Sequence, residues 1–483
     1  MNLSEYATHD ATSLAALVRA GQVTARELAE LALQAVEAVN GPLNAVIETF
    51  PDRLDALPSN RHADGPLVGV PMLNKDLIAE EGTRLELGSV LAQGLVAAED
   101  SALVAKLRRA GLNNLGRTTT PELGLASVTE SRIQGITRNP WDTGRTPGGS
   151  SGGSAAMVAA GAVPIATGGD GGGSIRSPAG HCGLVGLKPT RGRVSSAPMP
   201  ADPIAGLAVD FVLTRSVRDC AAVLDAAHGP VPGDAYGIPA PRRPYVDELA
   251  PPARPLRIGF TTTAWSGAPG DADARAGVAA ALAVLEAAGH VVEEARPECD
   301  HDALARAALD LWSVNTAHAF DGLGPFLGRT PGPDTLQSTT LALYRRGRTV
   351  PGVDIMAAME AFNTANHAVG AFFRHHDVLM TPTCLSAAPP IGAVRCDPEG
   401  PVDAAEWSAG MNRIDDFMPL FNISGHPAIS LPLHWTAGGL PVGVQLVAGF
   451  ADEATLFQLA ALFEQALPWQ GRRPPVHAGR PRG

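Results

Sequence analysis

Two segments of the chain show the hydrophobic spacing of helices together with residues that start and stop a helix. Thr24 and Glu27 form a T-x-x-E capping box, after which apolar residues keep helical spacing. We expect this helix to stop at the glycine-proline pair 41–42. Residues 101–110 predict a second helix, which Gly111 closes.

Short apolar runs elsewhere predict strands. Residues 67–70 are expected to form a strand that leads into the sequence PMLNKDL. Residues 254–260 and 290–295 are strand candidates on either side of an alanine-rich helix at 271–289. A strand–helix–strand order places its two strands parallel in one sheet, so the pattern predicts an α/β fold.

Composition and charge exclude several classes of protein. Of the 483 residues, 45% are hydrophobic and 18% are charged, and the net charge is -12, without a basic stripe that would bind nucleic acid. The first residues lack the pattern of a secretory signal, and the apolar segment 155–167 is too short to span a membrane. Five cysteines without CxxC spacing predict reduced thiols and a cytoplasmic protein, and no zinc motif is present.

Two glycine-rich stretches that contain serine lie close together in the middle of the chain. They are TPGGSSGGSA (146–155) and GGDGGGSIRSP (168–178). A flexible linker is a poor explanation because an apolar segment joins them, and the phosphate-binding loop needs a G-K-[ST] ending that is missing. Residues 148–152 also match G-x-S-x-G, the nucleophile elbow of α/β-hydrolases, although such a short pattern arises easily by chance among 53 glycines.

Longer motifs resemble the amidase signature family. They are GVPMLNKDL (69–77), GRTTTPELG (116–124), TRNPWDTGRTPGGSSGGSAAMVAAG (137–161), GGDGGGSIRSPAGHCGLVGLKPTRGRVS (168–195), DVLMTPT (377–383) and the segment from FNISGHPAISLPL to GLPVGVQLV (421–447). Because these motifs span nearly the whole chain, the resemblance implies one domain over 1–483 with its signature core at about 65–200. The implied fold is α/β, a mixed many-stranded sheet sandwiched between helices.

The resemblance implies a Ser–cis-Ser–Lys triad of Lys75, Ser150 and Ser174, with Ser174 as the nucleophile. It also implies a cis peptide bond at Ser150. A serine hydroxyl is a weak nucleophile until a base removes its proton, and a lysine acts as a base only when it is neutral. Burial favours neutral lysine because it lowers the pKa. Ser150 would pass the proton from Ser174 to Lys75.

The residues around Ser174 predict how the site holds negative charge. Backbone N–H groups of Gly171, Gly172, Gly173 and Ser174 are expected to form the oxyanion hole, since glycines leave such groups accessible. We expect Asp170 and Arg176 to brace this loop. A simple ion pair at the surface is the alternative for these two residues.

The chain departs from the common family pattern at two positions. Gly171 stands where a threonine or similar residue is commoner, and this form resembles the branch that contains 6-aminohexanoate cyclic-dimer hydrolases. The missing side chain would admit a bulkier or cyclic acyl group. Asn74 replaces a more usual apolar residue and would alter the surroundings of Lys75.

Other residues suggest a function but have simpler explanations. Cys384 is expected to be a buried, inert thiol, and His181 to pack within a loop, because the lysine already provides a base. Trp312 and Asn315 are candidates for the substrate pocket or for a plain helical core face. The proline-rich residues 230–255 are interpreted as a surface excursion, and residues 473–483 as a disordered tail.

The resemblance implies an amidase that cleaves a C–N bond through an acyl-enzyme on Ser174. Its substrate would be a small, mostly apolar amide, linear or cyclic. We expect no cofactor, metal, nucleic acid or membrane as a partner, and a homodimer is allowed. Three alternatives stay open: a carbamate or ester hydrolase of the same fold, the amide-hydrolysing subunit of a tRNA-dependent amidotransferase, and a non-catalytic binding protein.

Overall fold

The strands form one large mixed sheet and a small ribbon. The computed structural model describes residues 1–55, 57, 65–199, 203–235 and 237–480. In this part of the chain the large sheet has 11 strands. They are β1 (Val46–Thr49), β2 (Pro71–Lys75), β3 (Asn113–Thr118), β6 (Ile165–Asp170), β7 (Val185–Lys188), β8 (Val209–Thr214), β9 (Arg257–Phe260), β10 (Val291–Glu294), β11 (Val378–Pro382), β12 (Ala428–Trp435) and β13 (Pro441–Ala448). The ribbon consists of β4 (Glu130–Ser131) and β5 (Gly135–Ile136).

Helices precede, separate and follow these strands. They are α1 (Leu3–Tyr6), α2 (Ala11–Arg19), α3 (Ala25–Leu43), α4 (Ala102–Arg109), α5 (Gly152–Ala159), α6 (Arg176–Cys182), α7 (Val217–Ala227), α8 (Ala272–Ala287), α9 (His301–Phe326), α10 (Ser338–Gly347), α11 (Gly352–Phe372), α12 (Ala404–Asp415), α13 (Pro419–Ile423) and α14 (Glu453–Ala466). Short 3-10 turns lie at Pro51–Asp55, Glu122–Gly124 and Tyr245–Glu248.

The large sheet combines parallel and antiparallel strands. Its order is β1-β3-β2-β6-β8-β7-β12-β13-β11-β9-β10. Strands β3, β2 and β6 pair in parallel, as do β11, β9 and β10, while the strands between these groups pair antiparallel. The predicted parallel pair on either side of α8 is therefore confirmed as β9 and β10.

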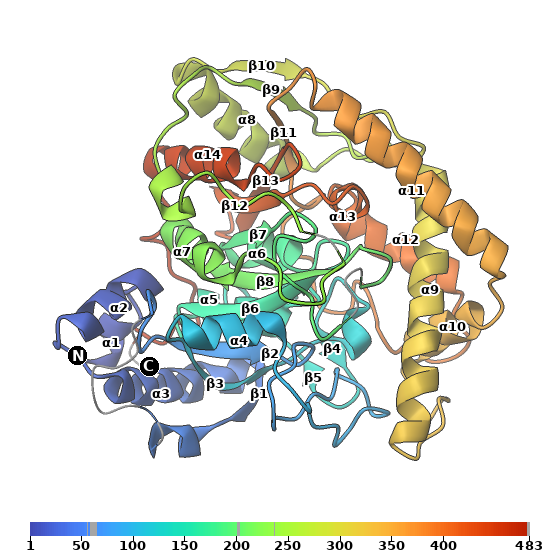
Figure 1. The fold of residues 1–483 in the computed structure, drawn as a ribbon, viewed down its shortest axis with the longest axis horizontal. Coiled ribbons are helices and arrows are strands. Elements are labelled where there is room, and N and C mark those ends of the chain that lie inside the picture. The colour runs from blue at the N-terminus through green and yellow to red at the C-terminus, as the bar shows by residue number, and fades with distance from the viewer. Residues whose placement is uncertain (56, 58–64, 200–202, 236, 481–483) are drawn as a thin grey trace.

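Helices cover the sheet on both faces, as Figure 1 shows. Helix α6 contacts β7, β12 and β13, and helices α8 and α14 also contact β12 and β13. Helices α9, α10 and α11 pack together along one side of the sheet, at the right of Figure 1. The chain is thus a single α/β domain with a mixed sheet between helices, as the sequence predicts.

Two of the predicted helices are confirmed, with one error at an end. Helix α3 begins after Thr24 with both hydrogen bonds of the capping box, and α4 matches the second predicted helix. The expected stop at residues 41–42 is wrong, because α3 continues through Pro42 to Leu43. A proline in the last helical turn removes a single backbone hydrogen bond, and Asn44 ends the helix in the left-handed conformation.

The strand predicted at residues 67–70 is wrong. This segment is a turn, in which Val70 N–H donates to Leu67 O, and β2 begins only at Pro71. Gly69 has φ +77, a left-handed conformation that ends extended structure. The apolar residues are buried, as a strand would bury them, so hydrophobicity alone misled the prediction.

The predicted disordered tail is wrong for residues 473–480, and residues 481–483 lie outside the described residues. Val476 N–H donates to Pro140 O and Ala478 N–H donates to Ala160 O, while His477 is buried. The described part of the proline-rich segment 230–255 follows the surface as predicted, and the buried ring of Tyr245 anchors it.

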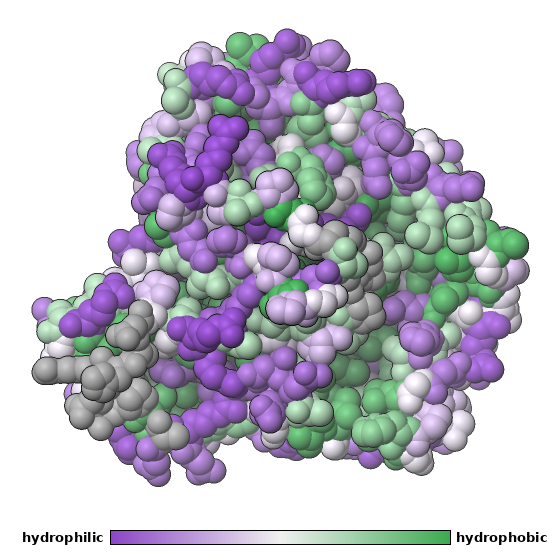
Figure 2. All heavy atoms as spheres, viewed as in Figure 1, coloured by the Kyte–Doolittle hydropathy of each residue, from purple (hydrophilic) through white to green (hydrophobic). Residues whose placement is uncertain are grey.

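The surface is mainly polar but contains an apolar patch. Figure 2 shows hydrophilic side chains over most of the viewed face, with apolar ones gathered toward the side of α9 and α11. Val353, Met356 and Met359 of α11 and Phe326 at the end of α9 are exposed there. Among the described helices, none combines the length and the apolar character that crossing a bilayer requires.

Candidate active site

The carboxyl ends of two parallel strands bring the predicted catalytic residues to one edge of the sheet. Strand β2 ends at Lys75, and its parallel neighbour β6 ends at Asp170. The chain then passes through three glycines to Ser174 before α6 begins at Arg176. Ligand sites in α/β proteins form at such carboxyl edges.

Lys75 contacts both serines of the first glycine-rich stretch. Its Nζ donates to Ser150 Oγ at 2.7 Å and to Ser151 Oγ at 3.0 Å. The peptide bond between Gly149 and Ser150 is cis, as the resemblance implied. A Cβ atom on Gly149 would lie 2.6 Å from backbone atoms of Val128, so this turn accommodates only glycine.

The second glycine-rich stretch lies directly against the first. Ser151 N–H donates to Ser174 O at 3.2 Å, so one backbone hydrogen bond joins the two serine turns. Gly173 has φ +133, and a Cβ atom there would lie 2.9 Å from Met418. The positive φ favours glycine immediately before Ser174, and a Cβ atom there would in addition displace the Met418 side chain.

The surroundings of Lys75 favour its neutral form. The side chain is fully buried, and this burial lowers its pKa to about 7, while the nearby carboxylates of Asp210 and Asp170 act in the opposite direction. A lysine with this pKa is neutral in a substantial fraction of molecules at neutral pH, and the neutral form can accept a proton. The geometry therefore joins a hydroxyl that can relay a proton to an amine that can receive one.

Asn74 acts on Lys75 through a threonine. Its Oδ1 accepts a hydrogen bond from Thr167 Oγ at 2.6 Å, and Thr167 Oγ accepts from the backbone N–H of Lys75 at 2.8 Å. Asn74 Nδ2 donates to Ile78 O. The Asn74 side chain thus links the end of β2 to β6 through hydrogen bonds, and it makes no hydrogen bond to the amine of Lys75.

Asp170 and Arg176 form an ion pair in the interior, so the surface-pair alternative is wrong. Both side chains are 0% exposed, and the guanidinium donates to the two carboxylate oxygens, each at 2.9 Å. Burial alone would raise the pKa of Asp170, but the charge and hydrogen bonds of Arg176 hold it well below its usual range. The carboxylate therefore stays ionised beside residues 171–174, which we call the nucleophile loop after the expected role of Ser174.

Further buried groups complete this network. Arg176 donates to Gln445 Oε1 at 2.7 Å and to Met418 O at 3.1 Å, and Asn422 Nδ2 donates to Asp170 O at 2.9 Å. Asn422 and Gln445 were not identified from the sequence, although both lie in the last family motif. The network connects the nucleophile loop to α13 and β13.

The same network uses one N–H group that was assigned to the oxyanion hole. Gly173 N–H donates to Asp170 Oδ1 at 2.8 Å, so this group already has an acceptor and its assignment is corrected. No acceptor is found within the described residues for the N–H groups of Gly171, Gly172 and Ser174. These three remain the candidate donors.

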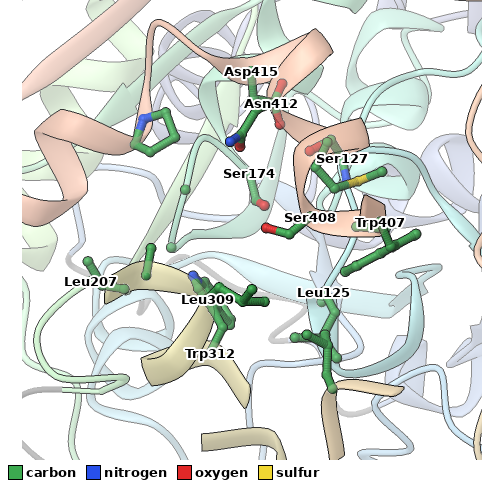
Figure 3. A pocket seen from close by; sticks show the side chains of 18 of the residues that line it. Leu125, Ser127, Ser174, Leu207, Leu309, Trp312, Trp407, Ser408, Asn412 and Asp415 are labelled. Atoms are coloured by element: carbon green, nitrogen blue, oxygen red, sulfur yellow. The ribbon is translucent and has the colours of Figure 1, made fainter. Parts of the chain in front are cut away.

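A cavity opens beside Ser174, as Figure 3 shows. Its volume is about 130 Å³, comparable to cavities of ~150 Å³ that hold a benzene molecule. Most of its lining is apolar and comes from the second half of the chain. The lining residues are Gly124, Leu125, Ala126, Ser127, Gly171, Gly172, Ser174, Leu207, Ala308, Leu309, Trp312, Leu343, Trp407, Ser408, Met411, Asn412, Asp415, Pro419 and Ile423.

One face of α12 supplies polar groups to this apolar cavity. Ser408, Asn412 and Asp415 line it at helical spacing. Burial raises the pKa of Asp415 to about 7, although the hydroxyls of Ser127 and Ser177 oppose this rise. None of these three residues lies in a recognisable motif of the sequence. Their spacing of four and three residues on one helix was the available signal.

Trp312 lines the cavity, whereas Asn315 is not among its lining residues. The Trp312 ring occupies the space beside Gly171, because a Cβ atom on that glycine would lie 2.9 Å from Trp312 Cη2 and Cζ2. The expected free space for a bulky acyl group at Gly171 is therefore wrong. The glycine instead makes room for the tryptophan that forms the cavity wall.

The remaining candidates behave as buried structural residues. Burial lowers the pKa of His181 to about 4, so its ring is neutral near pH 7, and it packs close to Gly148. Burial also raises the pKa of the Cys384 thiol well above its usual range. Both residues match the simpler explanations given by the sequence.

The nucleophile-elbow alternative fails on local structure. An elbow needs a strand directly before its serine and a helix after it. Irregular chain precedes Ser150, and its side chain is bonded to Lys75 rather than to a histidine. Among the residues that the structure describes, no group of three or more His, Cys, Asp and Glu side chains is arranged to hold a metal ion.

Comparison with known proteins establishes the family. The Amidase family model matches residues 27–457, most of the chain. The chain belongs to the amidase family. It is accordingly an amide-hydrolysing enzyme that acts on C–N bonds, as the sequence predicts.

Individual relatives extend this similarity over nearly the full length. The chain is 39% identical to the 6-aminohexanoate-cyclic-dimer hydrolase of Pseudomonas sp. (strain NK87) over 480 residues, which cover 96% of each protein. A solved structure of 6-aminohexanoate cyclic dimer hydrolase matches with a TM-score of 0.92 and 37% identity, covering 97% of this chain and 99% of that one. A bacterial aryl acylamidase matches with a TM-score of 0.86 and 26% identity, covering 98% and 99%.

Proposed function

We propose that this amidase cleaves small, mostly apolar amides, linear or cyclic, through an acyl-enzyme on Ser174. The observation that carries the proposal is the buried hydrogen bond from Lys75 Nζ to Ser150 Oγ, at the carboxyl edge where Ser174 also lies. A lysine, a relay serine and a nucleophilic serine are sufficient for acyl transfer when the lysine is neutral.

In the proposed first step, Ser174 Oγ attacks the amide carbon while its proton passes to Ser150, and Ser150 gives its own proton to Lys75. The protonated lysine then returns a proton by the same path to the leaving nitrogen, so the amine departs as a neutral molecule. In the second half of the cycle, water attacks the acyl carbon and gives its proton to Lys75 through Ser150. The proton then returns to Ser174 Oγ as the carboxylic acid is released, which restores Ser174. The lowered pKa of Lys75, about 7, supports this cycle near neutral pH.

The negative oxygen of the tetrahedral intermediate needs hydrogen-bond donors in a site that excludes water. The N–H groups of Gly171, Gly172 and Ser174 are suited to this role. Gly173 contributes indirectly, because its bond to Asp170 holds the loop in shape. Asp170 and Arg176 brace the loop from the interior.

The nature of the cavity supports the substrate class. Apolar walls bind the hydrocarbon part of a substrate, and a few polar groups orient it. Leu309, Trp312 and Ile423 provide such walls, and α12 provides the polar groups. The name of the relative that is 39% identical points in the same direction, toward a cyclic amide of aminohexanoate.

The five cysteines are unpaired, which supports a cytoplasmic location.

A hydrolysis screen of the purified chain tests the proposal. The panel contains cyclic and linear 6-aminohexanoate oligomers, aryl amides, carbamates, esters and glutamine, with Ser174→Ala as the control for each. Turnover of amides that Ser174→Ala abolishes is the expected result. Preference for carbamates or esters, or activity on glutamine only after partner proteins are added, would replace the proposal with one of its alternatives.

A further inference from the structure

Two carboxylates influence the proposed base, and only one of them is neutralised. Asp170 and Asp210 are the charged groups among the described residues whose fields act on Lys75. Asp170 is paired with Arg176 and accepts further hydrogen bonds from Asn422 and Gly173. The side-chain carboxylate of Asp210 has no hydrogen-bond or ion-pair partner among the described residues, so its charge is not compensated in this way.

The sheet places Asp210 across β6 from Lys75. Asp210 on β8 pairs with Gly169 on β6, and β2, which carries Lys75, pairs with the other side of β6. A Cβ atom on Gly169 would lie 2.6 Å from Asp210 Oδ1, so the carboxylate extends over the glycine backbone. Ser151, which accepts from Lys75 Nζ, also contacts Gly169, because Gly169 N–H donates to Ser151 Oγ at 3.3 Å. Gly169 thus lies between the carboxylate and the lysine.

We propose that Asp210 is a positioning residue for the general base, whose uncompensated carboxylate stabilises the positive charge that Lys75 acquires when it accepts the proton. The proposal rests on the proposed function of Lys75. Its physical basis is attraction between opposite charges, which little solvent weakens on the side of Lys75 because that side chain is fully buried, although Asp210 itself is partly exposed. The two groups influence each other in the expected directions: burial raises the pKa of Asp210 to about 6 and Lys75 opposes the rise, while burial lowers the pKa of Lys75 and Asp210 opposes the fall.

The proposal makes a specific prediction for Asp210→Asn. Without the carboxylate the pKa of Lys75 falls, so the acidic limb of the kcat/KM profile moves to lower pH by about one unit, the size expected for a neighbouring opposite charge. The value of kcat/KM on the plateau above this limb falls as well, because the lysine becomes a weaker base. A merely structural role would lower the plateau without moving the limb.

A second variant tests the geometry without removing the charge. Gly169→Ala would push the Asp210 carboxylate away, and the other atoms near the new Cβ are at 3.8 Å or more. The limb should again move to lower pH, by less than for Asp210→Asn. Asp210→Glu keeps the charge and should keep the limb near its original position.

Asp219→Asn is the matched control. Asp219 is fully buried, whereas Asp210 is partly exposed, and burial and Asp10 raise the pKa of Asp219 to about 6. Asp219 is not among the charges that act on Lys75. This variant should leave the limb unchanged. All profiles are measured with the full chain and a neutral aryl amide, so that the substrate does not titrate. Circular dichroism and thermal unfolding check that each variant is folded.

The outcomes separate this proposal from the proposed function. A limb that stays in place for both Asp210→Asn and Gly169→Ala overturns the role of Asp210, and the triad still stands if Lys75→Ala is inactive. If Asp210→Asn does not fold, the profile of Gly169→Ala decides. If Lys75→Ala keeps full activity, both proposals fail together.

Discussion

Lys75 Nζ lies 2.7 Å from Ser150 Oγ, although the two residues are 75 positions apart in the chain. The last residue of β2 and the turn before α5 meet in this one contact, and neither side chain has more than slight exposure to solvent. A lysine in such a place normally loses its charge, because burial disfavours the ammonium form. In the proposed mechanism this lysine is the base, and the mechanism requires no histidine.

Replacement of Lys75 provides the most direct test of this base. Lys75→Ala should lower kcat by about 10²–10⁴-fold, the usual contribution of a general base, and leave the fold intact. In the unaltered enzyme, activity should rise as the pH increases through about 7, since only neutral Lys75 accepts a proton. Steady-state kinetics from pH 5 to 9 measure both effects. His181→Asn serves as the control, and loss of turnover in that variant with Lys75→Ala still active would contradict the assignment.

A covalent reagent distinguishes the two serines of the proposed triad. An aryl sulfonyl fluoride should modify Ser174, which lines the cavity, and should not modify Ser150, which is 3% exposed and bonded to Lys75. Peptide mass spectrometry after proteolysis identifies the modified residue. Ser174→Ala should remain unlabelled. Modification of Ser150 with Ser174 untouched would reverse the two roles.

The ion pair beneath the nucleophile loop should be important for stability. Arg176→Met removes the charge that compensates Asp170 and leaves a buried carboxylate, which costs about 3–5 kcal/mol in the free energy of unfolding. Urea unfolding followed by fluorescence measures the loss. Arg26→Met is the control, because Arg26 forms a solvent-exposed pair with Glu30 and should have little effect. Equal effects of the two substitutions would show that the buried pair has no special role.

Local signals in the sequence predicted much of the fold because they act over a few residues. The capping box at Thr24 and the glycine at 111 mark real helix ends. The errors arose where distant contacts decide the structure. Residues 67–70 are apolar because the core covers them, and Val476 and Ala478 are ordered because they bond to residues more than 300 positions earlier.

The same distinction applies to the site. Lys75, Ser150 and Ser174 lie in motifs that are recognisable from the chain alone. No such motif marks the polar residues of the cavity, which are Ser408, Asn412 and Asp415. A polar helix face normally indicates exposure to water. Only the packing of α12 beside the nucleophile loop turns that face toward the cavity. The space next to Gly171 is a similar case, because Trp312 fills it from 141 residues away in the chain.

The contact between Gly171 and Trp312 leads to a prediction about substrate size. Gly171 does not have a positive φ, so its backbone accepts other residues, and the obstacle to a side chain is the Trp312 ring at 2.9 Å. Gly171→Thr should displace this ring into the cavity and reduce kcat/KM for bulky or cyclic amides more than for small linear ones. Rates across a panel of graded amides measure the difference.

A double variant determines whether the tryptophan is the cause. Trp312→Leu removes the ring, so combining it with Gly171→Thr should restore part of the lost activity on bulky amides, and the two effects should not add. Trp312→Leu alone should widen the range of substrates. If Gly171→Thr lowers all rates equally, and the second substitution restores none of them, the glycine affects the oxyanion donors rather than the wall of the cavity.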